Sequence, residues 1–149
     1  MRRAGVAALL GAAIVLSIAA CVGFHMHSLG SLGQSEDFPS QADIQRLAGL
    51  PVPRDALNVR ARIDLVITKR TLYLRFSLSP EDTQAFLDGL QADSLTSTSI
   101  SRDLLSSERP RWFAPETATR YRAAELPRRA ILVDETDPAL YTVYLKARG

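Results

Sequence analysis

The chain has 149 residues, a single cysteine and a formal net charge of +2 at pH 7. This length suits one domain with a real hydrophobic core and is short for two, and one cysteine excludes an internal disulfide. The surplus charge comes from Arg2 and Arg3, and the remaining sequence balances 16 basic against 16 acidic residues. A balanced chain without a basic run lacks the charge pattern that phosphate neutralisation requires, so we expect no nucleic-acid partner.

At the N-terminus, Arg2 and Arg3 precede an apolar run over 4–18 that ends in Ile18-Ala19-Ala20-Cys21. A bilayer core requires about 20 apolar residues, so this run is too short to span a membrane and is typical of a secretory signal peptide. Small residues before a cysteine at this place resemble the lipobox of bacterial lipoproteins, in which the chain is cut before the cysteine and its sulfur carries a diacylglycerol. The alternative is an ordinary cysteine near a conventional cleavage site.

The resemblance implies a signal peptide over 1–20, lipidation of Cys21, and a membrane partner bound through that lipid. One acyl chain binds marginally, whereas a lipoprotein cysteine carries two or three, which implies stable attachment. Val22 stands where many Gram-negative lipoproteins retained in the inner membrane have aspartate. The implied location is therefore a bacterial membrane, and in a Gram-negative source the periplasmic face of the outer membrane.

The following stretch over 21–37 is rich in Gly and Ser and shows no sustained helix or strand period, which is typical of a flexible tether reaching about 25 Å. His25-Met26-His27 offers nitrogen and sulfur to a soft metal, but no histidine follows His27. A metal site needs more ligands, so we interpret these residues as a solvated linker and expect no cofactor.

Two helices are predicted by their end signals. Ser40 can cap and Gly49 can stop a short helix over 41–48, whose apolar residues Ile44, Leu47 and Ala48 share one face. A second helix over about 80–91 has a hydroxyl cap at Ser79, followed by a proline and two carboxylates. Its predicted apolar face is Phe86, Leu87 and Leu90. Gly89 either permits a close approach to the sheet or ends the helix early.

Alternation of apolar and polar residues predicts a hairpin between these helices. The first strand, over 57–68, is long enough to require a bend or bulge. Its predicted dry face is Leu57, Val59, Ala61, Ile63, Leu65 and Ile67. Lys69-Arg70 is the predicted turn, and the second strand over 71–78 points Leu72, Leu74, Phe76 and Leu78 inward. Tyr73 and Arg75 form a second contact surface if the outer face is open to water.

The C-terminal third begins with a serine-rich loop over 93–110, which is either functional or conceals a short strand and a helical turn around Ile100, Leu104 and Leu105. A central strand over 130–133, a turn over 134–138 and a last strand over 140–147 follow. The expected fold is a single α+β domain over 38–149. It has one antiparallel sheet of about four strands, in two hairpins, with helical cover on one face.

The sequence holds no recognisable catalytic motif and no histidine base after His27. Asp134, Glu135 and Asp137 form the closest carboxylate cluster, which reads as a solvated turn and lacks calcium-loop spacing. We therefore expect a non-catalytic binding or accessory role in the cell envelope. The alternative is a small envelope hydrolase with a carboxylate or serine site that the sequence does not reveal.

Arginine and aromatic residues concentrate between positions 109 and 122, and these types are enriched in binding hot spots. The candidate binding residues are Arg109, Arg111, Trp112, Phe113, Arg120, Tyr121 and Arg122. They form either a binding edge for an envelope protein or small ligand, or a buried aromatic plug that arginines cover. The sequence over 50–78 also contains Leu50-Pro51-Val52-Pro53, Asn58-Val59-Arg60 and Tyr73-Leu74-Arg75-Phe76. These pieces resemble small bacterial envelope proteins, a resemblance that implies no particular activity.

Overall fold

The computed structural model describes residues 34–37, 39–92, 95 and 99–149. The chain divides after Gln34 into two compact units, and the second, Ser35–Gly149, holds the helices and nearly all of the sheet. The predicted signal peptide, the lipidation site Cys21 and the tether up to residue 33 lie outside the described residues. No helix in the described part of the chain has the length and apolarity needed to cross a bilayer.

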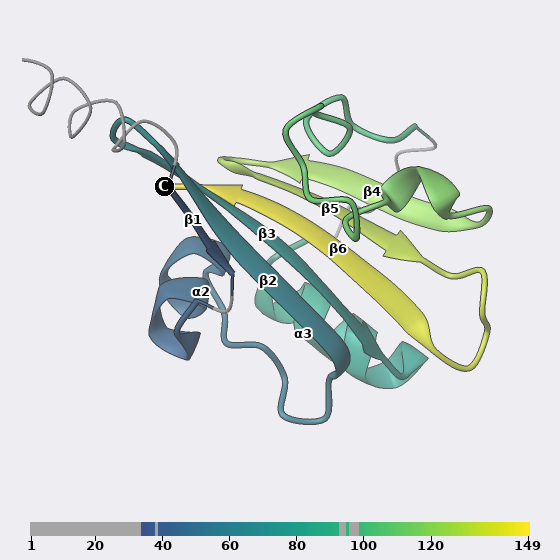
Figure 1. Ribbon diagram of the computed structural model, residues 1–149. Helices are drawn as coiled ribbons and strands as arrows, with labels where there is room; N and C mark the ends of the chain where they lie inside the picture. Colours follow the sequence, from purple (N-terminus) through teal and green to yellow (C-terminus); the bar gives the residue numbers. More distant parts are fainter. Residues whose placement is uncertain (1–33, 38, 93–94, 96–98) are drawn as a thin grey trace, which may run out of the picture. The chain divides into compact units, whose positions relative to one another are not determined.

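A six-stranded sheet with the order β1-β2-β3-β6-β5-β4 forms the centre of the fold (Figure 1). The strands are β1 (Gln34–Asp37), β2 (Leu57–Val66), β3 (Lys69–Leu78), β4 (Tyr121–Leu126), β5 (Arg129–Asp134) and β6 (Tyr141–Arg148). From β2 to β4 across the sheet, each strand is antiparallel to its neighbour. The predicted α+β class and single antiparallel sheet are confirmed, and the four predicted strands correspond to β2, β3, β5 and β6.

Two strands, β1 and β4, were not predicted from the sequence. β1 forms in the last four residues of the expected tether, and β4 has the sequence Tyr-Arg-Ala-Ala-Glu-Leu, whose apolar alternation is weak. β4 joins β5 through Pro127 and Arg128, since Leu126 pairs with Arg129. Arg128 has a positive φ of 62°, and proline followed by a positive φ is the pattern of a type II turn. A tight turn therefore makes β4-β5-β6 a continuous meander.

The predicted turn at Lys69-Arg70 is wrong, because both residues belong to β3. Val66 pairs with Lys69, so the turn residues are Ile67 and Thr68. The difference arises because Ile67, with a positive φ of 59°, leaves the extended conformation that its side chain suggests. The hairpin tip therefore lies two residues earlier in the chain than its polar residues indicate.

The expected bulge in β2 is confirmed, and it changes which residues the strand buries. The register shifts by one residue between Leu57 and Arg60, and Leu57 lies opposite Ser77. Because side chains alternate with a period of two, the extra residue moves Leu57 to the face opposite Ile63. The predicted continuous dry face is therefore wrong: Ile63 is 4% exposed, whereas Leu57 is 55% exposed.

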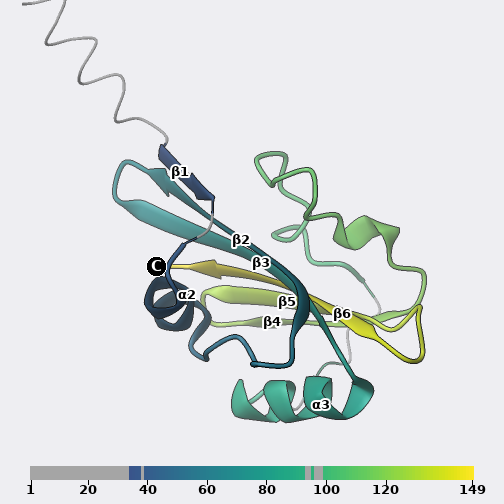
Figure 2. The ribbon, with the colours of Figure 1, turned by 60° about the horizontal axis from the view of Figure 1, so that its bottom comes forward.

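The main core lies between one face of the sheet and two helices, α2 (Gln41–Ala48) and α3 (Pro80–Gly89), which Figure 2 shows on the same side. Both caps form as predicted, with Ser40 and Ser79 each accepting a backbone N–H from the residue three positions later.

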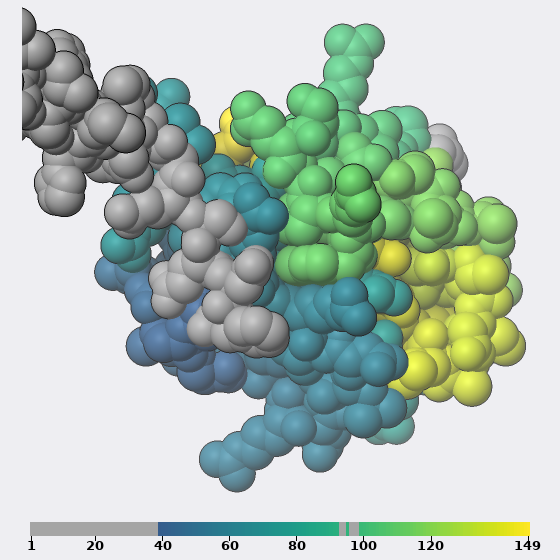
Figure 3. All heavy atoms as spheres, viewed as in Figure 1, coloured from purple at the N-terminus to yellow at the C-terminus, as the bar shows by residue number. Residues whose placement is uncertain are grey.

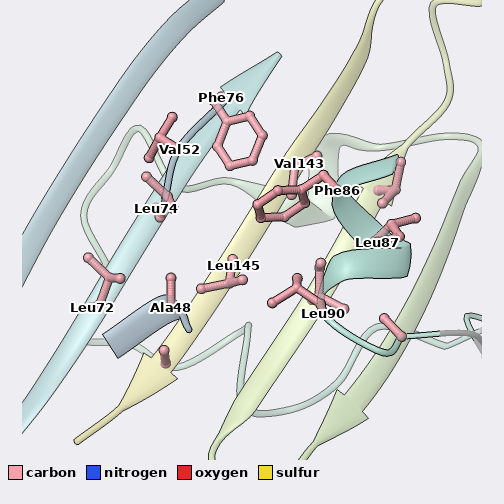
Figure 4. Packing of buried hydrophobic residues seen from close by; sticks show 14 of the residues in the cluster. Ala48, Val52, Leu72, Leu74, Phe76, Phe86, Leu87, Leu90, Val143 and Leu145 are labelled. Atoms are coloured by element: carbon pink, nitrogen blue, oxygen red, sulfur yellow. The ribbon is translucent and has the colours of Figure 1, made fainter. Parts of the chain in front are cut away.

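The main core is packed between the two helices and the central strands, because both helices contact β3 and β6. Figure 4 shows Leu72, Leu74 and Phe76 on β3 next to β6, with Ala48 of α2 at the Leu72 end. Phe76 meets Phe86 of α3 edge-to-face, with 5.1 Å between the ring centroids. α3 ends at Gly89, where an added Cβ would lie 2.9 Å from Leu50.

The opposite face of the sheet is covered by the described part of an irregular segment over 99–120, and this covering creates a second core. Figure 3 shows the green atoms of this segment packed beside the teal hairpin strands. The second core consists of Tyr73, Leu104, Phe113, Ala118, Ala123, Ala130, Leu132 and Tyr144. Tyr73 is 2% exposed, so the expectation that this face is open to water at Tyr73 is wrong. Successive turns, not a regular element, span Ser101–Phe113.

We predict that Phe76→Ala and Leu87→Ala each lower the free energy of unfolding by about 2–5 kcal/mol, because each leaves a cavity in the main core. Phe76 is fully buried and Leu87 is 1% exposed. Urea unfolding followed by tryptophan fluorescence measures the loss. Val59→Ala is the matched control, since Val59 is 45% exposed, and its loss should stay near 0.5 kcal/mol. Losses below about 1 kcal/mol in both core variants would contradict the assigned packing.

Candidate anion-binding site

The seven arginine and aromatic residues predicted to bind together do not form one site: six of them are divided among three sets of contacts, and Arg111 is exposed apart from these sets. Phe113 is fully buried and packs edge-to-face against Tyr73 and Tyr144, at 5.3 and 5.4 Å between ring centroids. Trp112 is half-buried and meets Phe113 at 6.1 Å. The aromatic pair is therefore the plug of the second core.

Arg109 fastens the irregular segment to itself. Its guanidinium donates hydrogen bonds to the carbonyl oxygens of Leu105 at 2.8 Å, Ser106 at 3.2 Å and Phe113 at 3.0 Å. It also pairs with the Glu116 carboxylate at 2.7 Å. Four partners from four residues use most of the donors of one arginine. Arg109 thus has a structural role, whereas Arg111 is exposed.

Arg120, Tyr121 and Arg122 lie at the start of β4 with a different partner. Glu135, from the acidic cluster after β5, accepts from Arg122 Nε at 2.5 Å and lies 3.8 Å from Arg120 Nε. Tyr121 is half-buried against the second core. The acidic cluster therefore joins the β5–β6 connection to β4 through Glu135, and these arginines are partly neutralised.

We predict that Arg109→Ala lowers the free energy of unfolding by about 2 kcal/mol, because several carbonyl groups and one carboxylate lose a charged donor. Arg111→Ala, the matched control two residues away, should change it by no more than about 0.5 kcal/mol. Thermal or urea unfolding of both variants provides the comparison. Equal effects of the two substitutions would show that Arg109 does not hold the segment.

A basic hollow lies at the end of the sheet where three chain segments meet. The backbone N–H of Arg148 donates to the carbonyl of Arg128 at 2.9 Å, and that of Gly149 donates to Arg70 at 2.9 Å. These bonds bring the end of β6 to the start of β3 and to the β4–β5 turn. The hollow has a volume of about 490 Å³. Its lining residues are Val66, Lys69, Arg70, Thr71, Tyr73, Glu108, Arg128, Lys146, Arg148 and Gly149.

The side chains around this hollow are strongly unbalanced in charge. Five are cationic and only Glu108 is a carboxylate. Among the described residues, Lys69 and Arg128 form no ion pair, and both are exposed. Arg70 lies 3.6 Å from Asp43, whose pKa is held below its usual range by the hydrogen bond from Ser40, and by nearby Arg46 and Arg70. Lys69 and Arg128 are therefore available to bind an anionic ligand.

Lys146 forms the fixed floor of the hollow. Its side chain is 4% exposed, and its ammonium group donates to the Asp103 carbonyl at 2.8 Å, the Asp103 carboxylate at 3.0 Å and Ser106 Oγ at 3.1 Å. It also lies 5.4 Å from the centre of the Tyr73 ring. Arg148 pairs with the same Asp103 carboxylate. Asp103 thus holds two cations on β6 in place and compensates only part of the positive charge.

A second hollow of about 520 Å³ adjoins the first and shares Arg128 and Arg148 with it. Its other lining residues are Arg102, Asp103, Ser106, Glu125, Leu126 and Arg129. The positively charged end of the domain therefore extends from the β2–β3 turn across the end of β6 to the irregular segment.

One serine–carboxylate pair bears on the hydrolase alternative. Ser101 donates to Glu125 at a small hollow beside β4, lined by both residues. Ser101 Oγ also accepts the backbone N–H of Asp103 at 3.1 Å, so its donor is used in a contact with β4 and an acceptor position is used in the local turn. Within the described residues, no group of three or more potential metal ligands occurs. The geometry of this pair supports a structural role.

Comparisons of this chain with protein-family models, with curated proteins and with solved structures find no match. The functional argument therefore depends on the site itself. Sequence reasoning missed the basic hollow because its cations come from 69–70, 128 and 146–148, and no local motif joins them. The one sequence signal was the paired basic residues Lys69-Arg70 and Arg128-Arg129, of which the first pair directly follows a hairpin turn and the second lies at the end of one.

Proposed function

We propose that this protein is a bacterial lipoprotein, attached to a membrane of the cell envelope through lipid on Cys21, with a non-catalytic binding role. Its folded domain binds an anionic group, a phosphate or a carboxylate, in the basic hollow. The observation that carries the proposal is the charge of that hollow, with five cationic side chains against one carboxylate in about 490 Å³. This volume accommodates a small anion or the anionic part of a larger partner.

Two properties of the hollow favour binding over mere solvation. Arg128 and Lys69 have no carboxylate partner among the described residues, so an incoming anion displaces only water from them. Arginine presents a planar fork of donors that matches carboxylate and phosphate oxygens. The three donors of the buried Lys146 ammonium are taken by Asp103 and Ser106, so Lys146 contributes fixed positive charge beneath the hollow and no hydrogen bond to the anion. Fixed positive charge beneath the hollow and free donors on Lys69 and Arg128 together provide what an anion receptor requires.

The membrane attachment is supported by the N-terminal sequence. Two arginines, a short apolar run and small residues precede the chain's single cysteine, at the place where lipoprotein processing occurs. A non-catalytic role agrees with the use of Ser101 in a contact that joins the irregular segment to Glu125 of β4, and with the lack of a histidine after His27.

We predict that Cys21→Ala abolishes fatty-acid labelling and releases the protein from membranes or blocks its processing, because the acyl chains are its strong anchor. Metabolic labelling followed by membrane fractionation measures both. Cys21→Ser serves as the isosteric control and should behave like the alanine variant. Wild type that takes up no fatty-acid label, or a processed alanine variant that remains fully membrane-bound, would overturn the anchor.

We predict that inorganic pyrophosphate binds the domain and that Lys69→Ala and Arg128→Ala each weaken binding at least fivefold. The reason is that each removes a free cation from the hollow. Isothermal titration at low salt measures the affinity, which should fall as salt rises. Arg54→Ala is the control, since Arg54 is exposed but lies outside the hollow, and it should leave the affinity unchanged. Equal weakening by all three would indicate diffuse charge attraction and would contradict a site.

A further inference from the structure

The tip of the β2–β3 hairpin is exposed and apolar. Val66 is 50% exposed and Ile67 is 70% exposed. Ile67 also has a positive φ of 59°, a conformation in which a β-branched residue is a true outlier and which glycine or asparagine adopts readily. Packing does not explain an isoleucine here, because most of its surface faces solvent. The tip thus has a property that the stability of the domain does not require.

The same end of the sheet carries the basic hollow. Val66 itself lines the hollow, and Lys69 is its direct partner in the hairpin. Lys69, Arg70, Arg128 and Arg148 are all exposed at this end. An apolar tip flanked by basic side chains is the arrangement that enters a membrane interface. The apolar residues reach the boundary of the acyl chains while Lys and Arg contact lipid phosphates.

The chain also enters the sheet at this end. β1 is the outermost strand beside β2, and Figures 1 and 2 both show it starting at the end that carries the β2–β3 turn. Gln34, its first residue, follows Cys21 by 13 residues. The flexible tether that the sequence predicts over this stretch would reach about 20 Å, so the proposed lipid on Cys21 would keep the start of β1 within that distance of the bilayer surface.

We propose that the tip residues Val66 and Ile67, together with Lys69, Arg70, Arg128 and Arg148, dock on the anionic phospholipid headgroups of the membrane that holds the anchor. This inference deepens the proposed function, because it identifies the bound anion as a lipid phosphate. A soluble phosphate in the hollow would account for the cations but not for the exposed apolar tip. A second copy of this chain fits poorly, because two identical cationic ends repel each other.

The docking test uses the full lipidated chain with Ile67→Cys, whose free thiol carries an environment-sensitive fluorophore while Cys21 is acylated. The protein is reconstituted in vesicles of phosphatidylcholine alone, or with about one third phosphatidylglycerol. We expect a blue shift and protection from iodide quenching only with phosphatidylglycerol. Asp137→Cys in the β5–β6 connection carries the control label and should show neither, since its exposed position lies outside both hollows.

A variant with reversed charge in the hollow distinguishes specific contact with lipid headgroups from mere nearness to the bilayer. Lys69→Glu combined with Arg128→Glu should abolish the shift at position 67 while the protein still floats with the vesicles. Both residues are exposed, and circular dichroism verifies that the variant is folded. A shift of equal size in pure phosphatidylcholine, or one that survives charge reversal, would overturn the headgroup contact.

The unlipidated Cys21→Ala chain tests docking independently of the anchor. Its co-sedimentation with phosphatidylglycerol vesicles should be salt-sensitive and should fall at least fivefold with Ile67→Asn, a substitution suited to the positive φ. If this chain binds vesicles but wild type is never acylated, the proposed lipid anchor on Cys21 is overturned and the docking of the hairpin tip is supported. If pyrophosphate binds but neither chain shows contact at position 67, docking is overturned and the hollow takes a soluble anion.

Discussion

The antiparallel pairing of β3 with β6 is the constraint on which the rest of the structure depends. It joins a hairpin from the middle of the chain to the last strand, with an unbroken register from Thr71–Arg148 to Leu78–Tyr141. Leu72, Leu74 and Phe76 then face the helices, whereas Tyr73 faces the irregular segment. Because both strands carry large apolar or aromatic side chains on each face, both faces of the sheet must be covered, and the two cores follow from that requirement.

The cover of the second face is held by charge as well as by apolar packing. Lys146 is buried on β6, and removal of its ammonium group from water is costly unless good partners compensate. Asp103 and Ser106 supply them from the irregular segment, and Arg109 organises the same segment through its carbonyl groups. A segment whose only regular element in the described residues is the short 3₁₀ helix Pro115–Thr117 thus obtains a defined position. The ion pair contributes specificity of position, since an apolar pair of similar volume would avoid the cost of desolvation.

The same β3–β6 pairing produces the charged end of the domain. It aligns the start of β3 with the end of β6, and the Arg148–Arg128 backbone bond adds the β4–β5 turn. Cations that are separated by many residues in a chain of nearly balanced charge thereby gather in one place. The overall charge balance excludes a generally basic protein but does not exclude a local basic surface, because the distribution of charge depends on the fold.

The sequence was sufficient to predict those features that depend only on residues close to each other in the chain. The caps at Ser40 and Ser79, the stop at Gly49 and the inward face of β3 follow from neighbouring residues, and each is confirmed. Tertiary structure alone decided the remaining features. A one-residue bulge reversed the face of Leu57, the turn moved to Ile67, and β4 formed through pairing with β5 despite its weak pattern.

The candidate sites show the same division. The sequence by itself determined which residue types the chain carries and where an apolar leader precedes Cys21. It did not determine that Arg109 is occupied by backbone carbonyls while Lys69 and Arg128 have no described ion-pair partner. That distinction depends on which distant groups come within hydrogen-bond distance. Only strand pairing and the packing of the irregular segment establish it, because both bring together residues that no local period connects.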